Sequence, residues 1–330
     1  MAVRAPDRML PKTASGRGCS RISCEANVQK HRLLEQLCDT GKIQNQPFHH
    51  QQKLQFFPHM SRDMNQLCRS HDVLLLVLDT LRFDVAKAEW DAERTPNLRG
   101  LLPDGWEKRH SPGSFTYAAH QAFFAGFLPT PATPNSTHTR LFAARFAGSE
   151  TTGPGTKIFD APDVISGMRA EGWRTICIGG VGFFNKQTPL SRVLPDLFEQ
   201  SFWETRFGVT ERDSTRHQFE FAAELVGNFG RPMFLFINLS ALHQPNYFYL
   251  KAHGPDTIES HAAALRYVDT QLPILIHALK AKQRPTFCVV TSDHGTMYGE
   301  DGWTGHRLAH PHVWTVPYAE AIVPNTGGVR

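Results

Sequence analysis

The chain has 330 residues, of which 41% are apolar and 20% are charged, a composition typical of a globular protein and unlike collagen, a coiled coil or a fully disordered chain. The longest unbroken apolar run, residues 73–78, has six residues, whereas a membrane-spanning helix needs about 20. Residues 1–70 carry 11 Lys and Arg against 5 Asp and Glu, so the net charge of +4 leaves −2 for residues 71–330, which argues against nucleic-acid binding by this larger part.

Residues 1–65 mix Gln, Asn, His, Ser and Arg with isolated apolar residues, and they predict a basic, disordered leader with at most one short helix near residues 30–38. No apolar stretch follows the basic residues at the N-terminus, so the sequence shows no secretory signal and predicts a cytoplasmic protein. The cysteines have neither disulfide-framework nor zinc-site spacing, which predicts reduced thiols. They are Cys19, Cys24, Cys38, Cys68, Cys177 and Cys288.

From residue 66 onward, apolar runs alternate with amphipathic segments. Four runs are apolar through most of their length, as parallel strands covered on both faces are; they are residues 73–78, 175–178, 233–237 and 286–291. Helical spacing predicts helices between them, over residues 161–170, 215–226 and 260–280. This alternation predicts an α/β fold with a doubly wound, mostly parallel central sheet and helices on both faces. Pro273 predicts a kink or a break in the last of these helices.

Polar residues follow three of the predicted strands. Asp79-Thr80 follows the first, the third runs on to His243, and the fourth ends in Ser292-Asp293-His294-Gly295. Ligands bind at the carboxyl ends of the strands in such sheets, and carboxylates and imidazoles are ligands of divalent metal ions. Considered alone, Asp79 could instead cap a helix, and the pair Asp293-His294 could instead form a hydrogen-bonded turn. Considered together, the three residues predict a metal site.

A hydroxyl at the start of a helix supplies further chemistry. Residues 111–129 contain Ser114, Thr116 and His120 at the start of an apolar, helix-like run that ends at Gly126. A divalent ion and the N–H groups of a helix N-terminus both favour negative charge on a nearby oxygen. A Thr or Ser in this position is therefore a candidate nucleophile.

These residues fall into ordered motifs that resemble those of the alkaline phosphatase and sulfatase superfamily, whose members are metal-dependent enzymes of phosphate and sulfate esters. The motifs are Leu78-Asp79-Thr80-Leu-Arg82-Phe-Asp84, Thr95-Pro-Asn-Leu98, Ala125-Gly126-Phe-Leu-Pro129, Gly172-Trp-Arg-Thr175, His243-Gln-Pro245, Ala264-Leu-Arg-Tyr267-Val-Asp269, Ser292-Asp293-His294-Gly295, Gly299-Glu300-x-Gly302 and His306. The resemblance covers about residues 71–320. It implies that residues 66–330 form an alkaline phosphatase-like catalytic domain, minimal because the chain stops soon after Tyr318 and leaves no room for the usual C-terminal subdomain.

The resemblance also implies a metal site and a nucleophile. The nucleophile of the superfamily lies ten residues before the glycine of its motif, which is Thr116 here, with Ser114 as the alternative if the register shifts. The implied metal ligands are Asp79, Thr116, Asp293 and His294, and the donor types are compatible with Zn, Mn, Mg or Ca.

The remaining implied roles concern the substrate and the support of the site. His243 and His306 are expected to position the phosphate or to protonate the leaving group. His120 is either a substrate-binding residue or a buried structural histidine. Arg82 and Asp84 are expected to pair and to brace the loop that follows the first strand.

Departures from the superfamily pattern favour phosphate esters over sulfate esters as substrates. Sulfatases need a Cys or Ser for conversion to formylglycine, and Thr116 cannot give that aldehyde; the sulfate-binding lysine is also missing from Gly179–Gly182. No second-metal motif is present, although His243, His306, His310 and His312 are candidates for such a site. The sequence therefore predicts a metal-dependent hydrolase or transferase of small-molecule phosphate esters. The alternatives are a sulfuric ester hydrolase and an inactive protein that binds a phosphorylated ligand or a partner.

Overall fold

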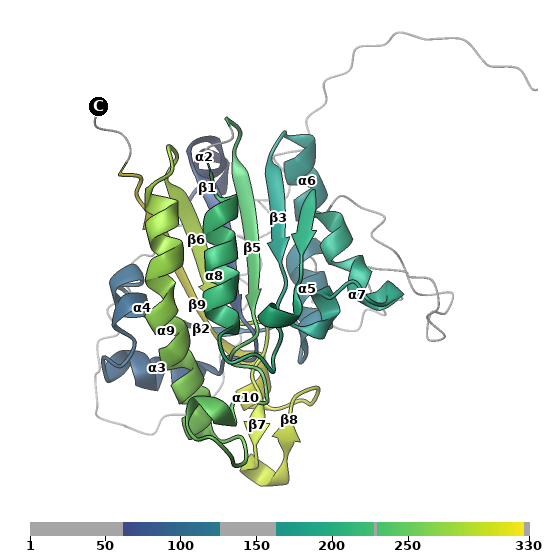
Figure 1. The fold of residues 1–330 in the computed structure, drawn as a ribbon, viewed down its shortest axis with the longest axis vertical. Helices are drawn as coiled ribbons and strands as arrows, with labels where there is room; N and C mark the ends of the chain where they lie inside the picture. The colour runs from purple at the N-terminus through teal and green to yellow at the C-terminus, as the bar shows by residue number, and fades with distance from the viewer. Residues whose placement is uncertain (1–61, 126–162, 228–229, 327–330) are drawn as a thin grey trace, which may run out of the picture. The chain divides into compact units, whose positions relative to one another are not determined.

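A seven-stranded sheet forms the centre of the protein in this computed structural model, which describes residues 62–125, 163–227 and 230–326. The strand order is β2-β9-β6-β1-β5-β3-β4 (Figure 1). The strands are β1 (Asp72–Leu78), β2 (Glu107–His110), β3 (Arg174–Ile178), β4 (Gln200–Phe202), β5 (Met233–Leu239), β6 (Thr286–Thr291) and β9 (Thr315–Val323). Neighbours from β6 to β4 run parallel, and β9 pairs antiparallel with both β6 and β2. The predicted α/β fold with a mostly parallel sheet is confirmed.

The four predicted strands correspond to β1, β3, β5 and β6, with bounds that differ by two residues at most. The antiparallel β9 and its partner β2 were not predicted. Proline is rare inside paired strands because it has no N–H to donate, and Pro317 interrupts the apolar pattern of β9. Its carbonyl nevertheless accepts hydrogen bonds from Ser292 N and Thr291 Oγ1, at 3.3 and 2.9 Å.

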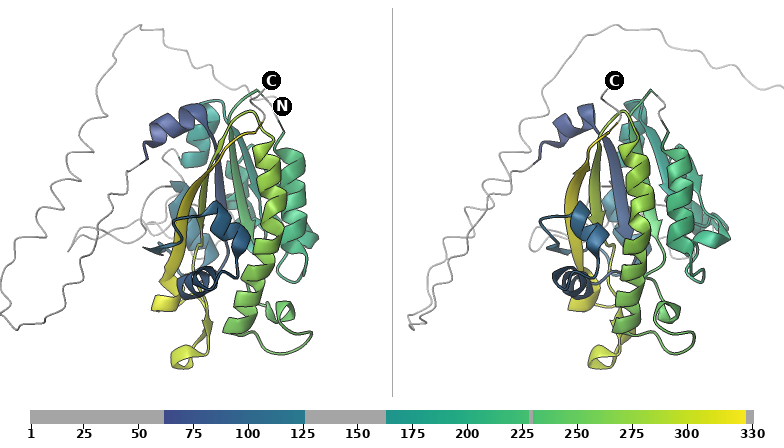
Figure 2. Two further views of the ribbon diagram at one scale, coloured as in Figure 1. Left: turned by 90° about the vertical axis from the view of Figure 1, so that its left-hand side faces the viewer. Right: turned by 60° about the vertical axis from the view of Figure 1, so that its left-hand side comes forward.

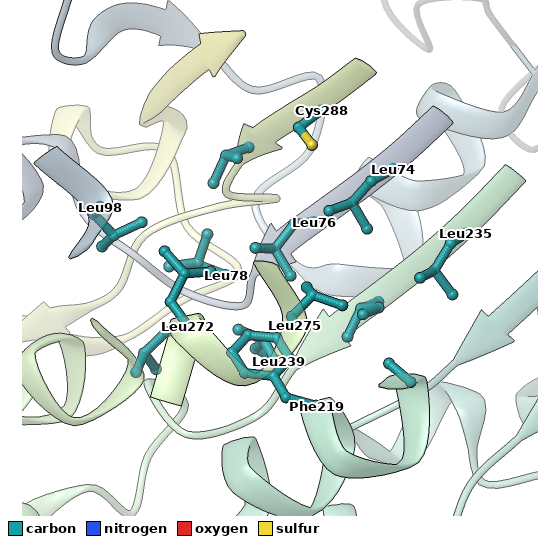
Figure 3. Close-up of a cluster of buried hydrophobic side chains, with 14 of the residues drawn as sticks. Leu74, Leu76, Leu78, Leu98, Phe219, Leu235, Leu239, Leu272, Leu275 and Cys288 are labelled. Atoms are coloured by element: carbon teal, nitrogen blue, oxygen red, sulfur yellow. The ribbon is translucent and has the colours of Figure 1, made fainter. Parts of the chain in front are cut away.

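Both faces of the sheet are covered. Along β1, Leu74, Leu76 and Leu78 pack into one buried apolar cluster (Figure 3), while Val73 and Val77 pack into a second cluster on the opposite face. Successive side chains of a strand point to opposite faces, so an apolar run without alternation is what a strand covered on both sides requires.

Helices make up the covering layers. They are α2 (Met64–Ser70), α3 (Phe83–Asp91), α4 (Pro96–Leu101), α5 (Thr116–Ala125), α6 (Val164–Ala170), α7 (Pro189–Val193), α8 (Ser214–Leu225), α9 (Ile258–Lys280) and α10 (Pro311–Trp314). Helices α8 and α9 lie side by side, as Figure 2 shows, and their side chains contribute to the first cluster. Side chains of α5 and α6 contribute to the second cluster. The predicted cover on both faces is therefore confirmed.

Helix α9 is continuous over 23 residues. The predicted break at Pro273 is therefore absent, and the alternative, a kink at Pro273, stays a prediction. A proline inside a helix costs about 3 kcal/mol because one hydrogen bond is lost. The burial of Leu272, Leu275 and Leu279 on the sheet-facing side offsets that cost, since each buried leucine contributes about 1.5–3 kcal/mol.

Some predictions concern residues that the structure does not describe. The predicted leader, residues 1–65, lies outside the described ranges except for its last four residues, so its boundary stays a prediction. The same holds for the short helix near residues 30–38, for Cys19, Cys24 and Cys38, and for Gly126. In the described ranges, Cys68, Cys177 and Cys288 are free thiols, and no helix there has the length and apolar character to traverse a bilayer.

Candidate active site

Three buried side chains converge at the carboxyl edge of the sheet. Asp79 follows β1, and Asp293 and His294 follow the neighbouring strand β6. All three are fully buried, and their ligand atoms lie within 4.8 Å of one another. Within residues 62–125, 163–227 and 230–326, this is the only group of three or more His, Cys, Asp or Glu side chains with the spacing to hold a metal ion.

In each of the two carboxylates, only one oxygen accepts hydrogen bonds from the described part of the protein. Asp79 Oδ2 accepts a hydrogen bond from Asn238 Nδ2 at 2.9 Å. Asp293 Oδ1 accepts from the backbone N–H groups of Thr80 and His294, at 3.2 and 3.0 Å. The other two oxygens, Asp79 Oδ1 and Asp293 Oδ2, are buried without a hydrogen-bond partner in the described part of the chain. Because unpartnered buried carboxylate oxygens are costly, this donor set fits a divalent metal ion.

Burial controls the ionisation of the three groups. Burial, with a contribution from the neighbouring Asp293, raises the pKa of Asp79 to about 6, and burial raises the pKa of Asp293 to about 7. Burial lowers the pKa of His294, so its imidazole stays neutral near pH 7, which is the form that binds metals. His294 Nδ1 lies 2.9 Å from the carbonyl oxygen of Gly295 and donates to it, which leaves the lone pair of Nε2 for the site.

Backbone turns after the two strands hold these ligands in place. Thr80 adopts a left-handed conformation with a φ of 65°, which is uncommon for a residue with a side chain, and its N–H reaches Asp293. A Cβ on Gly295 would lie 2.0 Å from the carbonyl oxygen of His312. Only glycine therefore permits this close approach of the two backbone segments directly after His294.

The hydroxyl of Thr116 lies at the same place. Thr116 is the first residue of α5 and is 2% exposed. Its Oγ1 is 3.3 Å from Asp79 Oδ2 and 3.3 Å from His294 Nε2. The alternative nucleophile, Ser114, precedes the helix, and no hydrogen bond joins its hydroxyl to the three ligands. The structure thus brings Thr116, and not Ser114, to the candidate metal ligands.

Two further histidines lie beside this group. The His306 ring is 4.6 Å from that of His294 and 5.5 Å from that of His243, measured between centroids. Together with Thr116, His243 and His306 line a pocket of about 560 Å³. Burial and the nearby His294 and His243 lower the pKa of His306 to about 3, so its imidazole is neutral near pH 7.

His120 lies in the aromatic core and is not among the residues that line this pocket. It is fully buried, its Nδ1 donates to the carbonyl oxygen of Thr116 at 2.8 Å, and the rings of Phe123, Phe124, Phe184 and Phe236 surround it. Burial lowers its pKa to about 3. This environment is that of a structural histidine, and a substrate-binding role for His120 stays a prediction.

The predicted pairing of Arg82 with Asp84 is confirmed. Arg82 Nε and Nη2 donate to the two oxygens of Asp84 at 2.9 and 2.6 Å. Arg82 Nη1 also forms an ion pair with Glu300, which lies in the loop between β7 (Met297–Tyr298) and β8 (Thr304–Gly305). Figure 1 shows this hairpin beyond the carboxyl end of the parallel strands. The guanidinium thus fixes the loop after Asp79 relative to the loop after His294.

His261 of α9 supports the same loop, and its burial predicts a dependence of the folding stability on pH. Its Nδ1 donates to Leu242 O at 3.3 Å, and its Nε2 accepts from Arg82 N at 3.4 Å. Burial and the charge of Arg82, opposed by Asp84, lower its pKa to about 4, below the unfolded value of about 6.5. The unfolded chain therefore binds more protons between these values, and stability is lost as the pH falls from about 6.5 to about 4.

We expect the variant His261→Gln to lack this part of the acid sensitivity, because glutamine accepts and donates the same hydrogen bonds without titrating. The stability of the wild type relative to the variant should fall by up to about 3 kcal/mol between pH 7 and pH 4. Urea unfolding at several pH values measures the difference. Parallel pH curves for the two proteins would contradict the assignment.

His310 and His312 each face a carboxylate. His310 Nε2 is 3.0 Å from Asp301 Oδ2, and His312 Nδ1 is 3.6 Å from Asp84 Oδ2. Among the described residues, His306, His310 and His312 belong to no group of three or more potential metal ligands, so a second metal site stays a hypothesis.

Asn238 is a site residue that the sequence analysis missed. It occupies the sixth position of β5 and pairs in register with Val77 of β1. Its Nδ2 donates to Asp79, and its Oδ1 accepts from the N–H groups of Gly180 and Val181, at 3.4 and 3.2 Å. The available signal was a single amide side chain within an otherwise apolar strand, because a buried polar group requires partners.

The fold and this site define an α/β protein with a candidate metal centre next to the hydroxyl of a helix N-terminus. A model of the Sulfatase family matches residues 71–319, which is well over half of the 330 residues. The chain therefore belongs to the Sulfatase family, within the alkaline phosphatase superfamily, and the resemblance inferred from the sequence is confirmed. Comparison with curated proteins finds no match.

Solved structures with a similar fold include phosphoethanolamine transferases. The C-terminal periplasmic domain of EptC from Campylobacter jejuni is 15% identical, with a TM-score of 0.51, and the match covers 77% of this chain and 80% of that one. The corresponding domain of EcEptC from Escherichia coli in complex with Zn is 15% identical, with a TM-score of 0.52, and the match covers 78% of this chain and 74% of that one. The soluble domain of lipooligosaccharide phosphoethanolamine transferase A from Neisseria meningitidis is 15% identical, with a TM-score of 0.50, and the match covers 77% of this chain and 76% of that one. At this identity the likeness shows the fold alone.

Proposed function

We propose that the chain is a metal-dependent enzyme of phosphate esters in which Thr116 attacks the phosphorus and carries the phosphoryl group covalently. The observation that carries the proposal is the position of Thr116 Oγ1, 3.3 Å from both Asp79 Oδ2 and His294 Nε2 at the first residue of α5. Membership of the Sulfatase family supports ester chemistry. A threonine favours phosphate over sulfate, because it cannot become formylglycine.

The proposed reaction has two balanced steps. In the first, a bond forms between Thr116 Oγ1 and phosphorus while the bond from phosphorus to the alcohol oxygen breaks, giving phosphothreonine and the free alcohol. In the second, water or another alcohol attacks the same phosphorus and releases Thr116. The hydroxyl proton has an acceptor within the site, since the carboxylate oxygen Asp79 Oδ2 lies 3.3 Å from Thr116 Oγ1, while Asp79 Oδ1 is left for the metal ion.

Asp79, Asp293 and His294 would hold the divalent ion. When bound, such an ion lowers the pKa of a nearby hydroxyl and offsets negative charge on phosphoryl oxygens. The hard oxygen donors and one imidazole fit Zn, Mn, Mg or Ca, and the Zn in the related EcEptC structure supports testing zinc first.

We assign the orientation of the phosphoryl group to His306 and a proton transfer to His243. A neutral His306 can donate one N–H hydrogen bond to a phosphoryl oxygen. His243 Nδ1 donates to Gln244 O at 2.6 Å, so a proton on its Nε2 requires the imidazolium form. Because His243 lines the pocket, we assign this imidazolium the delivery of its Nε2 proton to the departing alcohol oxygen, which leaves His243 neutral.

Turnover of three nitrophenyl esters tests the proposal. The full chain is treated with EDTA and then given Zn, Mn, Mg or Ca with nitrophenyl phosphate, bis(nitrophenyl) phosphate or nitrophenyl sulfate. We expect metal-dependent release of nitrophenol from a phosphate ester, at least about 100-fold faster than from the sulfate, since the site lacks the formylglycine that sulfate transfer uses.

Two other outcomes would contradict the proposal. Faster turnover of the sulfate would assign the chain as a sulfuric ester hydrolase. Tight metal binding by calorimetry, with no turnover of any ester, would support an inactive phospholigand-binding protein.

A further inference from the structure

The described lining of the pocket beside Thr116 carries a positive charge and, apart from the candidate metal ligands behind Thr116, lies away from carboxylates. None of the described residues that line it is Asp or Glu. Its one permanently charged lining residue, Arg307, is exposed, and its guanidinium stacks on the ring of Phe115 at 5.3 Å. In the described part of the chain, no carboxylate forms an ion pair with Arg307. The charge of Arg307 is therefore free to act on whatever occupies the pocket.

One wall of this pocket is apolar. Val181, Phe183, Leu190 and Val209 line it, and all four belong to or pack against the buried cluster on the α5 side of the sheet. A volume of about 560 Å³ is within the range of small-molecule sites, which combine apolar walls with a few polar groups. The alcohol part of an ester attacked by Thr116 would lie against this wall, since Thr116 lines the same pocket.

We infer that, given the proposed reaction at Thr116, this pocket selects esters whose alcohol part is apolar and either uncharged or anionic, and that it rejects cationic amino alcohols. An ammonium group here would be repelled by Arg307 and would find no carboxylate as a counter-charge among the described lining residues. Quaternary ammonium groups bind well in cages of several aromatic rings, but Phe183 is the only Phe, Tyr or Trp among the described lining residues. The inference sets this chain apart from transferases of phosphoethanolamine.

Thr188 offers a way to reverse the charge of the pocket without disturbing the fold. It lines the pocket, is exposed, and caps α7, where its Oγ1 accepts from Ser191 N at 3.2 Å. Asp and Asn cap helices as well as Thr does. Thr188→Asp therefore adds a carboxylate to the pocket while keeping the cap, and Thr188→Asn is the matched uncharged control.

Phosphocholine and 3,3-dimethylbutyl phosphate form the matched pair of substrates, because the second replaces the quaternary nitrogen by carbon at the same shape. With the metal-loaded full chain, we expect kcat/KM to be about tenfold or more higher for 3,3-dimethylbutyl phosphate, whose alcohol part is uncharged. Repulsion between two charges at short range is enough to produce a difference of this size. Thr188→Asp should reduce this preference by about tenfold, and Thr188→Asn should leave it within about twofold. Arg307→Gln should reduce it in the same direction as Thr188→Asp.

Calorimetric binding of the two corresponding phosphonates to Thr116→Ala separates this inference from the proposed function. Tighter binding of the phosphonate with the uncharged dimethylbutyl group, reduced by Thr188→Asp and not by Thr188→Asn, supports the inference even without turnover. Absence of turnover of both esters would count only against the proposed reaction at Thr116. Equal binding, or tighter binding of the cationic phosphonate, would overturn the inference while leaving the reaction at Thr116 intact.

Discussion

Replacement of Thr116 by alanine should lower phosphate-ester turnover by roughly 10⁴-fold or more, the range seen when a covalent nucleophile is removed. The structure gives the reason, because Thr116 Oγ1 is the hydroxyl that lies 3.3 Å from both Asp79 and His294. Steady-state kinetics with nitrophenyl phosphate at saturating metal measures the loss. Thr116→Ser keeps a hydroxyl on the same helix residue and should retain most of the turnover.

Rapid acid quenching gives an independent readout of the same prediction. The wild type should carry one phosphoryl group on the peptide that contains Thr116, and Thr116→Ala should carry none. Ser114→Ala is the matched control, since Ser114 lies two residues away and its hydroxyl makes no hydrogen bond to the metal ligands. Turnover that survives in Thr116→Ala would remove this residue from the mechanism.

Asp293→Asn should abolish tight binding of the divalent ion and at the same time stabilise the metal-free protein. Asparagine keeps an oxygen that accepts from Thr80 N and His294 N, but it puts an NH₂ group where Asp293 has its unpartnered oxygen. Burial raises the pKa of Asp293 to about 7, above the unfolded value of about 3.9. The folded state therefore resists ionisation, and stability falls as the pH rises from about 4 through 7.

The stability gained by Asp293→Asn should thus be largest above pH 7, on the order of 3 kcal/mol, and should vanish toward pH 4. Urea unfolding in EDTA at several pH values measures it, and calorimetry with zinc or manganese measures the loss of metal binding. Asp72→Asn is a matched control for a buried carboxylate, because Asp72 forms ion pairs with Lys282 and Arg284 at 3.1 and 3.3 Å. It should destabilise the protein and leave metal affinity unchanged; unaltered metal affinity in Asp293→Asn would contradict the site.

The strand ends were predictable from the sequence for a physical reason. In a parallel sheet the carboxyl ends of neighbouring strands meet at one edge, so residues after two apolar runs, Asp79 and the pair Asp293-His294, could be expected to lie together. Thr116 was different. Its hydroxyl lies on a helix, and only the spacing within a family-like motif distinguished it from Ser114.

What the sequence did not predict depends on tertiary contacts. Asn238 lies one residue beyond the predicted strand 233–237, and its role becomes evident only when β5 is placed beside β1 in register. Glu300 becomes the partner of Arg82 only when the β7–β8 hairpin folds over the loop after β1. Helix α9 keeps Pro273 because tertiary burial outweighs local propensity. In each case the deciding energy comes from residues that are distant along the chain.

The separation of the site residues along the chain has a kinetic consequence. Thr80 and Asp293, joined by a hydrogen bond at the site, are 213 residues apart in sequence, and β1 and β6 are adjacent strands in the middle of the sheet. An ion bound by Asp79, Asp293 and His294 would act as a reversible cross-link between the ends of β1 and β6. Its removal by a chelator should therefore speed global unfolding, so that the lifetime of the native state depends on the supply of metal.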